Sequence, residues 1–388
     1  MNKSTLYYIW LTQGIGYCTT KVKYVYNLYP DIENIYTGGE QELRLCGIFT
    51  ENEIAKLLKT KLCDAEAIYK KCIELNYKVY DISMEEYPQR LRDIPDAPAV
   101  IYVSGNLPDF ENTDSVSIVG TRRATVYGIR TSLSIGANLS KIGFVVVSGG
   151  ALGIDCAAHR GVLQEKGKAV CVLGCGIDYD YLRENKELRN AIASTGALVS
   201  EYPPGTSAAS HNFPQRNRII SALSNGVIVV EAPKKSGSMI TVDFALKQGK
   251  DVFAVMGNVD SPYSAGSNQL IKEGAVPITC WQDVAEYYRG VMDDEIEATT
   301  EDIVNTVPSK NKDITAHSEN KPVPVHKNTD NLSDEERKVY LALSDTPIHV
   351  DVLTEKCALP MHIIIRTVSS LELKDLIENT SGRLYAIK

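Results

Sequence analysis

The chain has 388 residues, 44% of them hydrophobic, and a formal net charge of -8, and this length suits two or three domains with proper cores. Its nine cysteines form no CxxC pair and no Cys/His cluster of zinc spacing, which argues against a disulfide framework and against a metal site. No apolar run approaches the roughly 18 residues that a membrane helix needs, and YYIWL is too short for a signal peptide. We therefore expect a cytoplasmic protein without membrane contact.

Residues 1–80 carry helical patterns. The stretch LYYIWLTQGIGYCTTKVKYVYNLY places apolar residues on one face of two short helices around Gly14-Ile15-Gly16, which resembles a small helix-hairpin-helix or SAM-like domain. The glycine turn of such a unit either contacts a DNA backbone through free amide groups or is a tight turn between helices. The absence of lysines at this turn favours the structural interpretation.

After an extended lead-in with several prolines, the centre of the chain alternates apolar strands with helix-like segments. The strands are predicted at Ser115–Val119, Phe144–Ser148, Ala169–Leu173, Ala197–Ser200, Val227–Glu231 and Asp251–Val255. Continuous apolar runs such as FVVV and VIVV are typical of a parallel sheet that is covered on both faces. Residues 81–290 are therefore predicted to hold an α/β domain with a Rossmann-like, doubly wound parallel sheet, which binds ligands at the carboxyl ends of its strands.

Residues 291–331 are acidic, contain prolines and are poor in apolar residues, which predicts a disordered linker. After it, LSDEERKVYLAL, HVDVLTEKCALPMHIIIRTVSSLELKDLIE and RLYAIK indicate a helix, a helix-turn-helix and a final strand. Residues 332–388 thus match a C-terminal winged-helix domain. Arg366 and Lys374 are too sparse around the apparent recognition helix to predict strong DNA binding, so partner docking or autoregulation is an equal alternative.

Positive charge gathers in the centre of the chain. Residues 112–280 hold 17 lysines and arginines against 13 acidic residues, whereas the remainder holds 24 against 36. Glycines, hydroxyls, basic residues and one phenylalanine follow the predicted strands. In chain order these are Gly120, Arg122 and Arg123, then Ser148 and Gly149, then Arg183, then Phe213, Arg216 and Arg218, and finally Lys235, Ser236, Gly237 and Ser238.

This mixture of residues favours a single-stranded nucleic-acid track over a mononucleotide pocket. Arginine forks and backbone amides at helix starts bind phosphate oxygens, and an aromatic ring gives an unpaired base a stacking surface. A dinucleotide cofactor needs a GxGxxG turn and an acidic ribose partner, and no such fingerprint follows the first strand. We therefore expect a single-stranded nucleic acid as the ligand and no cofactor.

Some of these residues also have structural interpretations. Arg160 and Arg216 are explained equally well as buried ion-pair partners of Glu201 and Glu231. His159 is expected to be a packed framework residue, because no Ser or Cys nucleophile lies at a recognisable spacing from it.

Three residues are stronger candidates for ligand contact. Arg122, Phe213 and Lys235 stand in loops flanked by glycine or proline, where packing gives little reason for a charge or an exposed ring. Asp155 and Asp178 are instead expected to cap helices or form turns.

Seven motifs run through the centre with ordered spacing. They are SIVGTRR, VVSGGALGIDCAAHRGVL, VLGCGID, VSEYPPG, FPQRNRII, EAPKKSGSMIT and GSNQLIKEGA. Together they resemble the DprA/Smf family of DNA-processing proteins, densely over residues 110–278 and more loosely in the flanking segments. The resemblance implies a non-enzymatic homodimer that binds single-stranded DNA in a basic pocket, protects incoming strands during natural transformation and loads the RecA recombinase onto them.

The resemblance also implies roles for individual residues. These are phosphate binding at Arg122 with Arg183 on the rim, base stacking at Phe213 with Arg216 and Arg218 beside it, and anion binding by Lys235, Ser236, Gly237 and Ser238. The sequence departs from the family pattern at two places: Leu152 stands where an arginine is common, and Tyr181-Leu182 replaces a tyrosine-proline pair. The first departure removes a possible phosphate contact.

The family pairs through the late part of its Rossmann domain, which corresponds here to SPYSAGSNQLIKEGAVPI. In this segment Leu270, Ile271, Ala275 and Val276 offer apolar side chains near the sheet edge. We expect them to form a two-fold interface, with packing under the last helix as the alternative for each residue.

An enzyme is the alternative function. Proteins resembling the lysine-decarboxylase-like phosphoribohydrolases share this Rossmann variant and carry a catalytic glutamate on the helix after a GGxGT turn. The corresponding stretch, KSGSMITVDFA, has Asp243 but neither a glutamate nor a GGxGT turn. A nucleotide phosphoribohydrolase is therefore the secondary hypothesis.

Overall fold

The computed structural model describes residues 2–290, 332–343, 348–357, 359–374, 376–381 and 384–387. The chain divides into two compact units, one containing residues 2–290 and the other containing the described residues from 332 onward. The disordered linker predicted at 291–331 lies outside the described residues. No helix in the described ranges is long and apolar enough to cross a membrane.

Five helices open the first unit: α1 (Lys3–Ile15), α2 (Lys21–Leu28), α3 (Glu33–Leu45), α4 (Glu51–Lys59) and α5 (Leu62–Glu74). The first of them is buried over most of its length, because it packs against α4, α5 and the adjacent sheet. The sequence pattern predicts apolar residues on one face of this helix only. In the structure, buried residues lie all around it. The turn after it starts at Gly16, whose φ of 86° lies in the left-handed region that favours glycine.

Nine strands form one sheet in the order β1-β2-β6-β5-β4-β3-β7-β8-β9. They are β1 (Lys78–Asp81), β2 (Val100–Gly105), β3 (Ser115–Val119), β4 (Val145–Ser148), β5 (Ala169–Leu173), β6 (Ala197–Ser200), β7 (Gly226–Val229), β8 (Asp251–Val255) and β9 (Val276–Ile278). Strands β3 to β8 are the six predicted ones, and their parallel pairing confirms the doubly wound α/β fold. β9 extends the parallel part, whereas β1 and β2 add an antiparallel edge.

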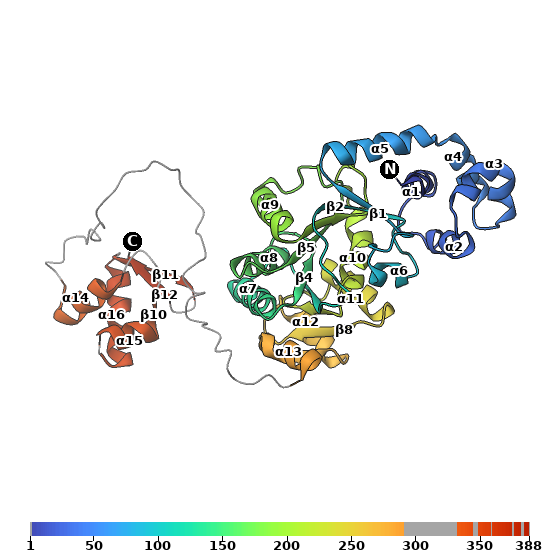
Figure 1. Cartoon of the computed structure of the whole chain (residues 1–388). Coiled ribbons are helices and arrows are strands. Elements are labelled where there is room, and N and C mark those ends of the chain that lie inside the picture. Colours follow the sequence, from blue (N-terminus) through green and yellow to red (C-terminus); the bar gives the residue numbers. More distant parts are fainter. Residues whose placement is uncertain are drawn as a thin grey trace. The chain divides into compact units, whose positions relative to one another are not determined.

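Helices cover both faces of this sheet. They are α6 (Gln89–Asp93), α7 (Val126–Lys141), α8 (Ile154–Gln164), the short 3-10 helix η1 (Arg183–Asn185), α9 (Lys186–Thr195), α10 (Asn212–Ala222), α11 (Gly237–Lys247), α12 (Ala265–Lys272) and α13 (Trp281–Arg289). Figure 1 shows α7, α8 and α9 on one side of the sheet and α10 and α11 on the other. The chain thus leaves the neighbouring strands β3 and β7 toward opposite faces, which makes their carboxyl ends a topological switch point.

The boundary expected between residues 80 and 81 does not separate two compact units. β1 spans this position and pairs with β2 along its whole length. The N-terminal helices and the sheet also share one hydrophobic core, in which α1 contacts both β1 and β2. The helical segment is therefore packed onto the α/β domain as part of the same unit.

The second unit has the predicted winged-helix order. Its elements are α14 (Asp334–Ala342), β10 (Ile348–His349), α15 (Val350–Cys357), α16 (Met361–Leu373), β11 (Ile377–Ser381) and β12 (Leu384–Ile387). The strands form an antiparallel sheet in the order β10-β12-β11 beside a separate small core. Arg366 is ion-paired with Glu335, and Lys374 with Glu336, whose pKa is lowered to about 2 chiefly by the hydrogen bond from Lys374.

Candidate functional site

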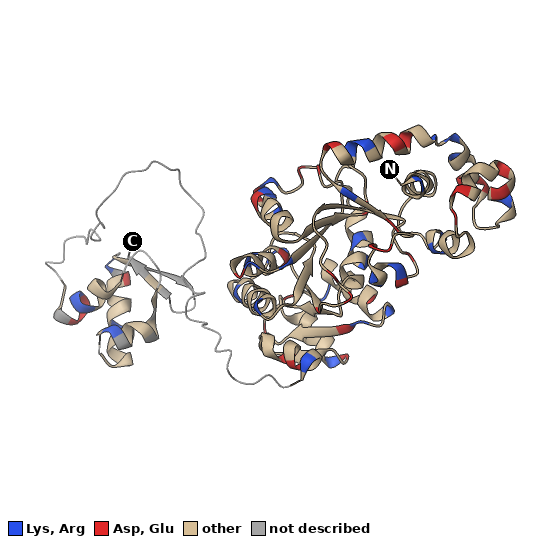
Figure 2. Ribbon diagram, viewed as in Figure 1, with Lys and Arg blue, Asp and Glu red and all other residues tan. Residues whose placement is uncertain are grey.

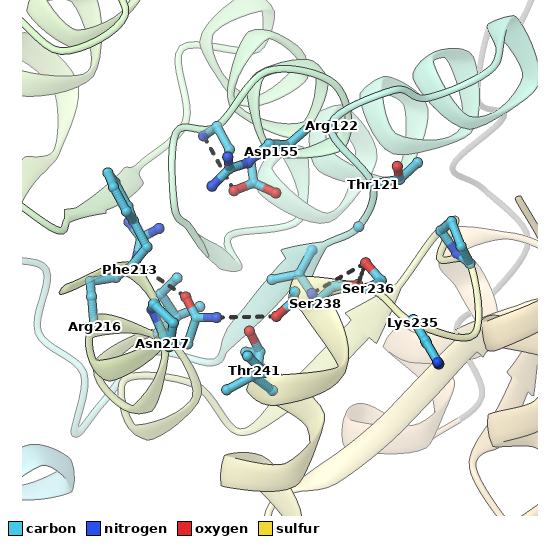
Figure 3. A pocket seen from close by; sticks show the side chains of 18 of the residues that line it. Thr121, Arg122, Asp155, Phe213, Arg216, Asn217, Lys235, Ser236, Ser238 and Thr241 are labelled. Atoms are coloured by element: carbon cyan, nitrogen blue, oxygen red, sulfur yellow. Dashed lines mark hydrogen bonds between the residues drawn. The ribbon is translucent and has the colours of Figure 1, made fainter. Parts of the chain in front are cut away.

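A pocket of about 590 Å³ opens at the switch point between β3 and β7 (Figure 3). Its walls come from the loop after β3, the start of α8, the first half of α10 and the loop that leads into α11. The predicted site residues that line it are Gly120, Arg122, Arg123, Phe213, Arg216, Lys235, Ser236, Gly237 and Ser238. Four segments that are far apart in the sequence therefore meet where a doubly wound sheet binds its ligands.

The loop after β3 is held rigidly from beneath. A Cβ atom at Gly120 would lie 2.6 Å from Ile154 and 2.7 Å from the Glu231 carbonyl oxygen, so only glycine fits there. The buried Glu231 carboxylate accepts hydrogen bonds from the amide and the hydroxyl of Thr125, at 2.9 and 2.6 Å. With its backbone fixed in this way, the loop presents the exposed side chains of Arg122 and Arg123 to solvent.

The Arg122 guanidinium lies over the Phe213 ring, 5.8 Å from its centroid. Phe213 is half-buried, and the Tyr181 ring packs against it with a centroid separation of 5.0 Å. Gly174 gives the ring room, since a Cβ atom at this position would come within 2.9 Å of it. A cation and an aromatic face are thus placed together on one wall of the pocket.

The opposite wall is the amino terminus of α11. The Ser236 hydroxyl accepts a hydrogen bond from the Ser238 amide at 3.3 Å and caps the helix. Lys235, just before the cap, is exposed and forms no ion pair within the described residues. A lysine beside the amino terminus of a helix favours an anion at this position.

Asp155 contributes the acidic side chain of the pocket lining. The Ala151 amide donates a hydrogen bond to it at 3.3 Å, which confirms its predicted role as a helix-start turn former. Burial raises the pKa of this carboxyl to about 6, against the opposing effect of the nearby Arg216 charge. A carboxylate turned toward backbone amides leaves the positive charges of the pocket available.

Arg216 lines the pocket but is almost fully buried, and burial lowers the pKa of its guanidinium. The guanidinium donates to the carbonyl oxygens of Gly149, at 2.9 Å, and of Val172. Arg216 therefore ties α10 to the ends of two strands and is not an ion-pair partner of a glutamate. Gly149 takes part through its carbonyl group and is absent from the pocket lining.

Arg218 and Ser148 are wrong as contacts to an external ligand, because neither side chain reaches solvent. The Arg218 guanidinium is fully buried and binds the Glu201 carboxylate at 2.7 Å and the Asp96 carboxylate at 3.2 Å. The hydroxyl of the fully buried Ser148 donates to the Ile118 carbonyl at 2.6 Å. Ser148 is the last residue of β4 and Arg218 lies on α10, and both side chains face the core.

Arg183 is exposed in η1 but lies outside the pocket lining and is ion-paired with Asp180 at 3.0 Å. Arg160 is also exposed, which excludes it as a buried ion-pair partner. His159 is fully buried, as expected for a framework residue, and burial lowers its pKa to about 3, so its ring stays neutral. Asp178 accepts a hydrogen bond from the Gly205 amide at 2.7 Å, as a turn former does.

The segment proposed for dimerisation forms α12 and β9. Leu270 is 5% exposed and belongs to the core of its own unit, so it is wrong as an interface residue. Ile271, Ala275 and Val276 are only partly buried at the β9 edge of the sheet. These three residues keep surface available for a partner.

The cysteines do not form a reactive or metal-binding group. All nine are free thiols, and burial raises the pKa of Cys72, Cys156 and Cys171 to about 12. In the part of the chain that the structure describes, no three His, Cys, Asp or Glu side chains are grouped to hold a metal ion.

Two features of the site have no signal in the sequence: the ring partner of Phe213 and the need for glycine at position 128. Tyr181, the ring partner of Phe213, lies on a different loop, so its only signal in the sequence is that it matches the tyrosine of the family's tyrosine-proline pair. Gly128 is required because a Cβ atom there would lie 2.3 Å from the Glu231 carboxylate. The glutamate that anchors the first loop comes from the end of another strand, which a linear pattern does not indicate.

A doubly wound sheet with a basic pocket at its switch point, followed in the chain by a winged helix, defines a Rossmann-like protein with an appended winged-helix domain. A family model described as DNA recombination-mediator protein A matches residues 78–289, and one described as DprA winged helix domain matches residues 323–383. The chain belongs to the DprA/Smf family.

Relatives and solved structures agree with this assignment. The DNA processing protein DprA of Bacillus subtilis (strain 168) is 42% identical over 205 residues, which are 53% of this chain and 69% of that protein. The X-ray structure of DprA from Streptococcus pneumoniae aligns with a TM-score of 0.64 and 32% identity, over 74% of this chain and 98% of that one. DNA processing protein A from Helicobacter pylori, whose structure gave insights into its single-stranded DNA binding mode, aligns with a TM-score of 0.50 and 31% identity, over 55% of this chain and 95% of that one.

Proposed function

We propose that this protein binds single-stranded DNA, without sequence preference, in the pocket between β3 and β7. The observation that carries the proposal is the convergence of Arg122, Arg123 and Lys235 with the Phe213 ring on one pocket lining. Guanidinium and ammonium groups bind phosphates, and a ring offers an unpaired base a stacking surface that is independent of sequence. The Helicobacter pylori relative, studied for its single-stranded DNA binding mode, supports the same ligand class.

The pocket suits a polyanion better than a dinucleotide. In dinucleotide-binding folds, an acidic residue accepts hydrogen bonds from the ribose. Here the buried Glu231 is occupied by Thr125, and Asp155 is turned toward the Ala151 amide. The pocket therefore offers its ligand cations, amides and an aromatic ring.

We also propose that the protein is a binding protein and not a nucleotide hydrolase. Asp243, the nearest counterpart of the catalytic glutamate of phosphoribohydrolases, is exposed on α11 and absent from the pocket lining. Incubation with nucleoside monophosphates should release no free base, while oligothymidine binds with an affinity that rises with its length. Turnover of a monophosphate would establish the enzymatic alternative.

In the cell, we propose that the protein acts in the cytoplasm, protects incoming strands during natural transformation and loads a RecA-type recombinase onto them. Membership of the DprA/Smf family supports this role. The test is the rate at which the recombinase coats single-stranded DNA that is already covered by a competing single-strand-binding protein. The rate should rise when this protein is added, and an unchanged rate would refute the loading role.

Phe213→Ala should lower the affinity for single-stranded DNA by about 1–3 kcal/mol, because the stacking surface for one base is lost. The slope of log affinity against log salt should not change, since no charge is removed. Tyr181→Ala is the matched control, because it removes the ring behind Phe213 and leaves Phe213 in place. Unchanged affinity combined with a lower melting temperature would mean that Phe213 serves packing alone.

We propose a two-fold homodimer that pairs through the partly exposed Ile271, Ala275 and Val276. Ile271→Glu should give a folded monomer with weaker binding to long oligonucleotides and nearly normal binding to short ones, because two linked sites increase the effective concentration for a long strand. Light scattering at micromolar concentration measures the assembly. A monomer for the unmodified protein contradicts the proposal.

A further inference from the structure

A second exposed aromatic ring is Tyr127, in the first turn of α7, which follows the pocket-lining Arg122 and Arg123 in the chain. Its side chain is 49% exposed, yet its hydroxyl donates a hydrogen bond to the Met256 carbonyl oxygen at 2.9 Å. This bond links α7 to the residue that follows β8 and fixes the ring. None of the close ring pairs in the described part of the chain includes Tyr127. The ring is therefore a rigid, unoccupied face whose polar end is already satisfied.

The surroundings of Tyr127 combine apolar surface with positive charge. Val126 and Met256 are 74% and 45% exposed, and Met256 accepts the tyrosine hydrogen bond. Arg123 precedes the ring, and Arg130 follows it by three residues, on the same side of the helix. Both arginines are exposed, and neither forms an ion pair among the described residues. Ring and guanidinium groups side by side match a nucleotide better than an apolar protein surface.

Tyr127 lies farther along the carboxyl ends of the strands than Phe213 does, because its hydroxyl binds the Met256 carbonyl after β8. Phe213 packs on Gly174, which follows β5, and the strand order from there is β5-β4-β3-β7-β8. Four strand spacings separate β5 from β8, about 19 Å at roughly 4.8 Å each. The exposed Arg123 lies on the loop that runs from the pocket to Tyr127. A single-stranded DNA that leaves the pocket past Arg123 would therefore reach Tyr127 next.

We propose that Tyr127 is a second base-stacking residue, so that single-stranded DNA runs from Phe213 across the end of β7 and places a later base on Tyr127. This inference rests on the proposed function, since it extends the same DNA site. It also predicts that the two rings serve oligonucleotides of different minimum length, because the shortest strands fill the pocket alone.

The test compares Tyr127→Ala, Tyr127→Phe and the unmodified protein by fluorescence anisotropy with oligothymidines of about four to about sixteen nucleotides, the usual range of single-strand site sizes. Tyr127→Ala should weaken binding of the long strands about tenfold and leave the shortest unchanged, with an unaltered salt slope. Tyr127→Phe keeps the ring and should bind as the unmodified protein does. Tyr24→Ala, which removes a tyrosine on α2 that is 61% exposed, is the control and should change nothing.

Photo-crosslinking with 5-iodouracil in the oligonucleotide gives a second measurement on the unmodified protein. Peptide mapping should find the crosslink at Tyr127 with long strands and not with the shortest. Equal affinity of Tyr127→Ala and the unmodified protein for every length, with no crosslink at Tyr127, overturns the inference and leaves the proposed function intact. Absence of any single-stranded DNA binding by the unmodified protein overturns both.

Discussion

Arg122→Glu is expected to abolish measurable binding of single-stranded DNA, with a loss of about 3 kcal/mol or more, which is more than a hundredfold. The substitution removes a phosphate ligand and adds a negative charge beside the remaining cations of the pocket. The exposed Arg122 side chain lies over the Phe213 ring and acts electrostatically on Asp155, but it forms no hydrogen bond or ion pair among the described residues. The melting temperature should therefore stay nearly unchanged.

Lys141→Glu is the matched control for this prediction. It makes the same change in net charge at an exposed position. Lys141 is the last residue of α7, whereas the pocket lies beside the first residues of that helix. Its affinity for single-stranded DNA should remain close to that of the unmodified protein. If both variants lose binding equally, the effect comes from net charge and the assignment of Arg122 to the site is wrong.

Arg218→Ala is expected to destabilise the protein by about 3–5 kcal/mol, because it leaves the Glu201 carboxylate buried without its cation. One oxygen of Glu201 already lacks a hydrogen-bond partner, and the other accepts from Arg218 at 2.7 Å. Glu201 follows β6, and Arg218 lies on α10, the helix that carries Phe213. Denaturation by guanidinium chloride measures the loss as a lower midpoint.

The double variant Arg218→Met with Glu201→Leu is the control for Arg218→Ala. Replacing both members of a buried ion pair by apolar residues of similar volume is often neutral, so the double variant should recover most of the lost stability. Asp96, the other partner of Arg218, is 22% exposed and stays in contact with solvent. Neither change should alter the salt slope of DNA binding, since the guanidinium does not face solvent. A reduced salt slope in the double variant would restore Arg218 as a phosphate contact.

Much of the fold could be predicted from the sequence because the central strands are buried on both faces. Runs such as VSIV and VIVV have no other stable environment, and β3 to β8 begin and end within two residues of the predicted bounds. The sequence analysis treats the mostly buried β2 only as part of an extended lead-in, and it misses β1 and β9 for a physical reason. β1 and β9 are edge strands with partly exposed residues, so their apolar pattern is weak. The single core shared by the N-terminal helices and the sheet depends on packing that no local pattern records.

The sequence predicts those pocket residues that directly follow the predicted strands, because the carboxyl ends of parallel strands lie together. Arg122 and Lys235 stand in loops that follow strands of a doubly wound sheet, Phe213 lies in the first turn of α10, and the structure brings all three to one lining. Arg216 and Arg218 stand in the same motif, FPQRNRII, but on a helix, where a rotation of 100° per residue decides which side chain faces inward. The sequence alone does not give that rotation, so a buried ion pair and a pocket residue look alike.

The most direct test of the account is a titration with single-stranded and duplex oligonucleotides over a range of salt concentrations. If Arg122, Arg123 and Lys235 each neutralise one phosphate, log affinity for the single strand should fall with log salt at a slope of about -2, from about 0.7 per phosphate. Duplex DNA should bind much more weakly, because its paired bases cannot reach the Phe213 ring. A flat salt response, or equal affinity for the duplex, would contradict the proposal that this pocket binds single-stranded DNA.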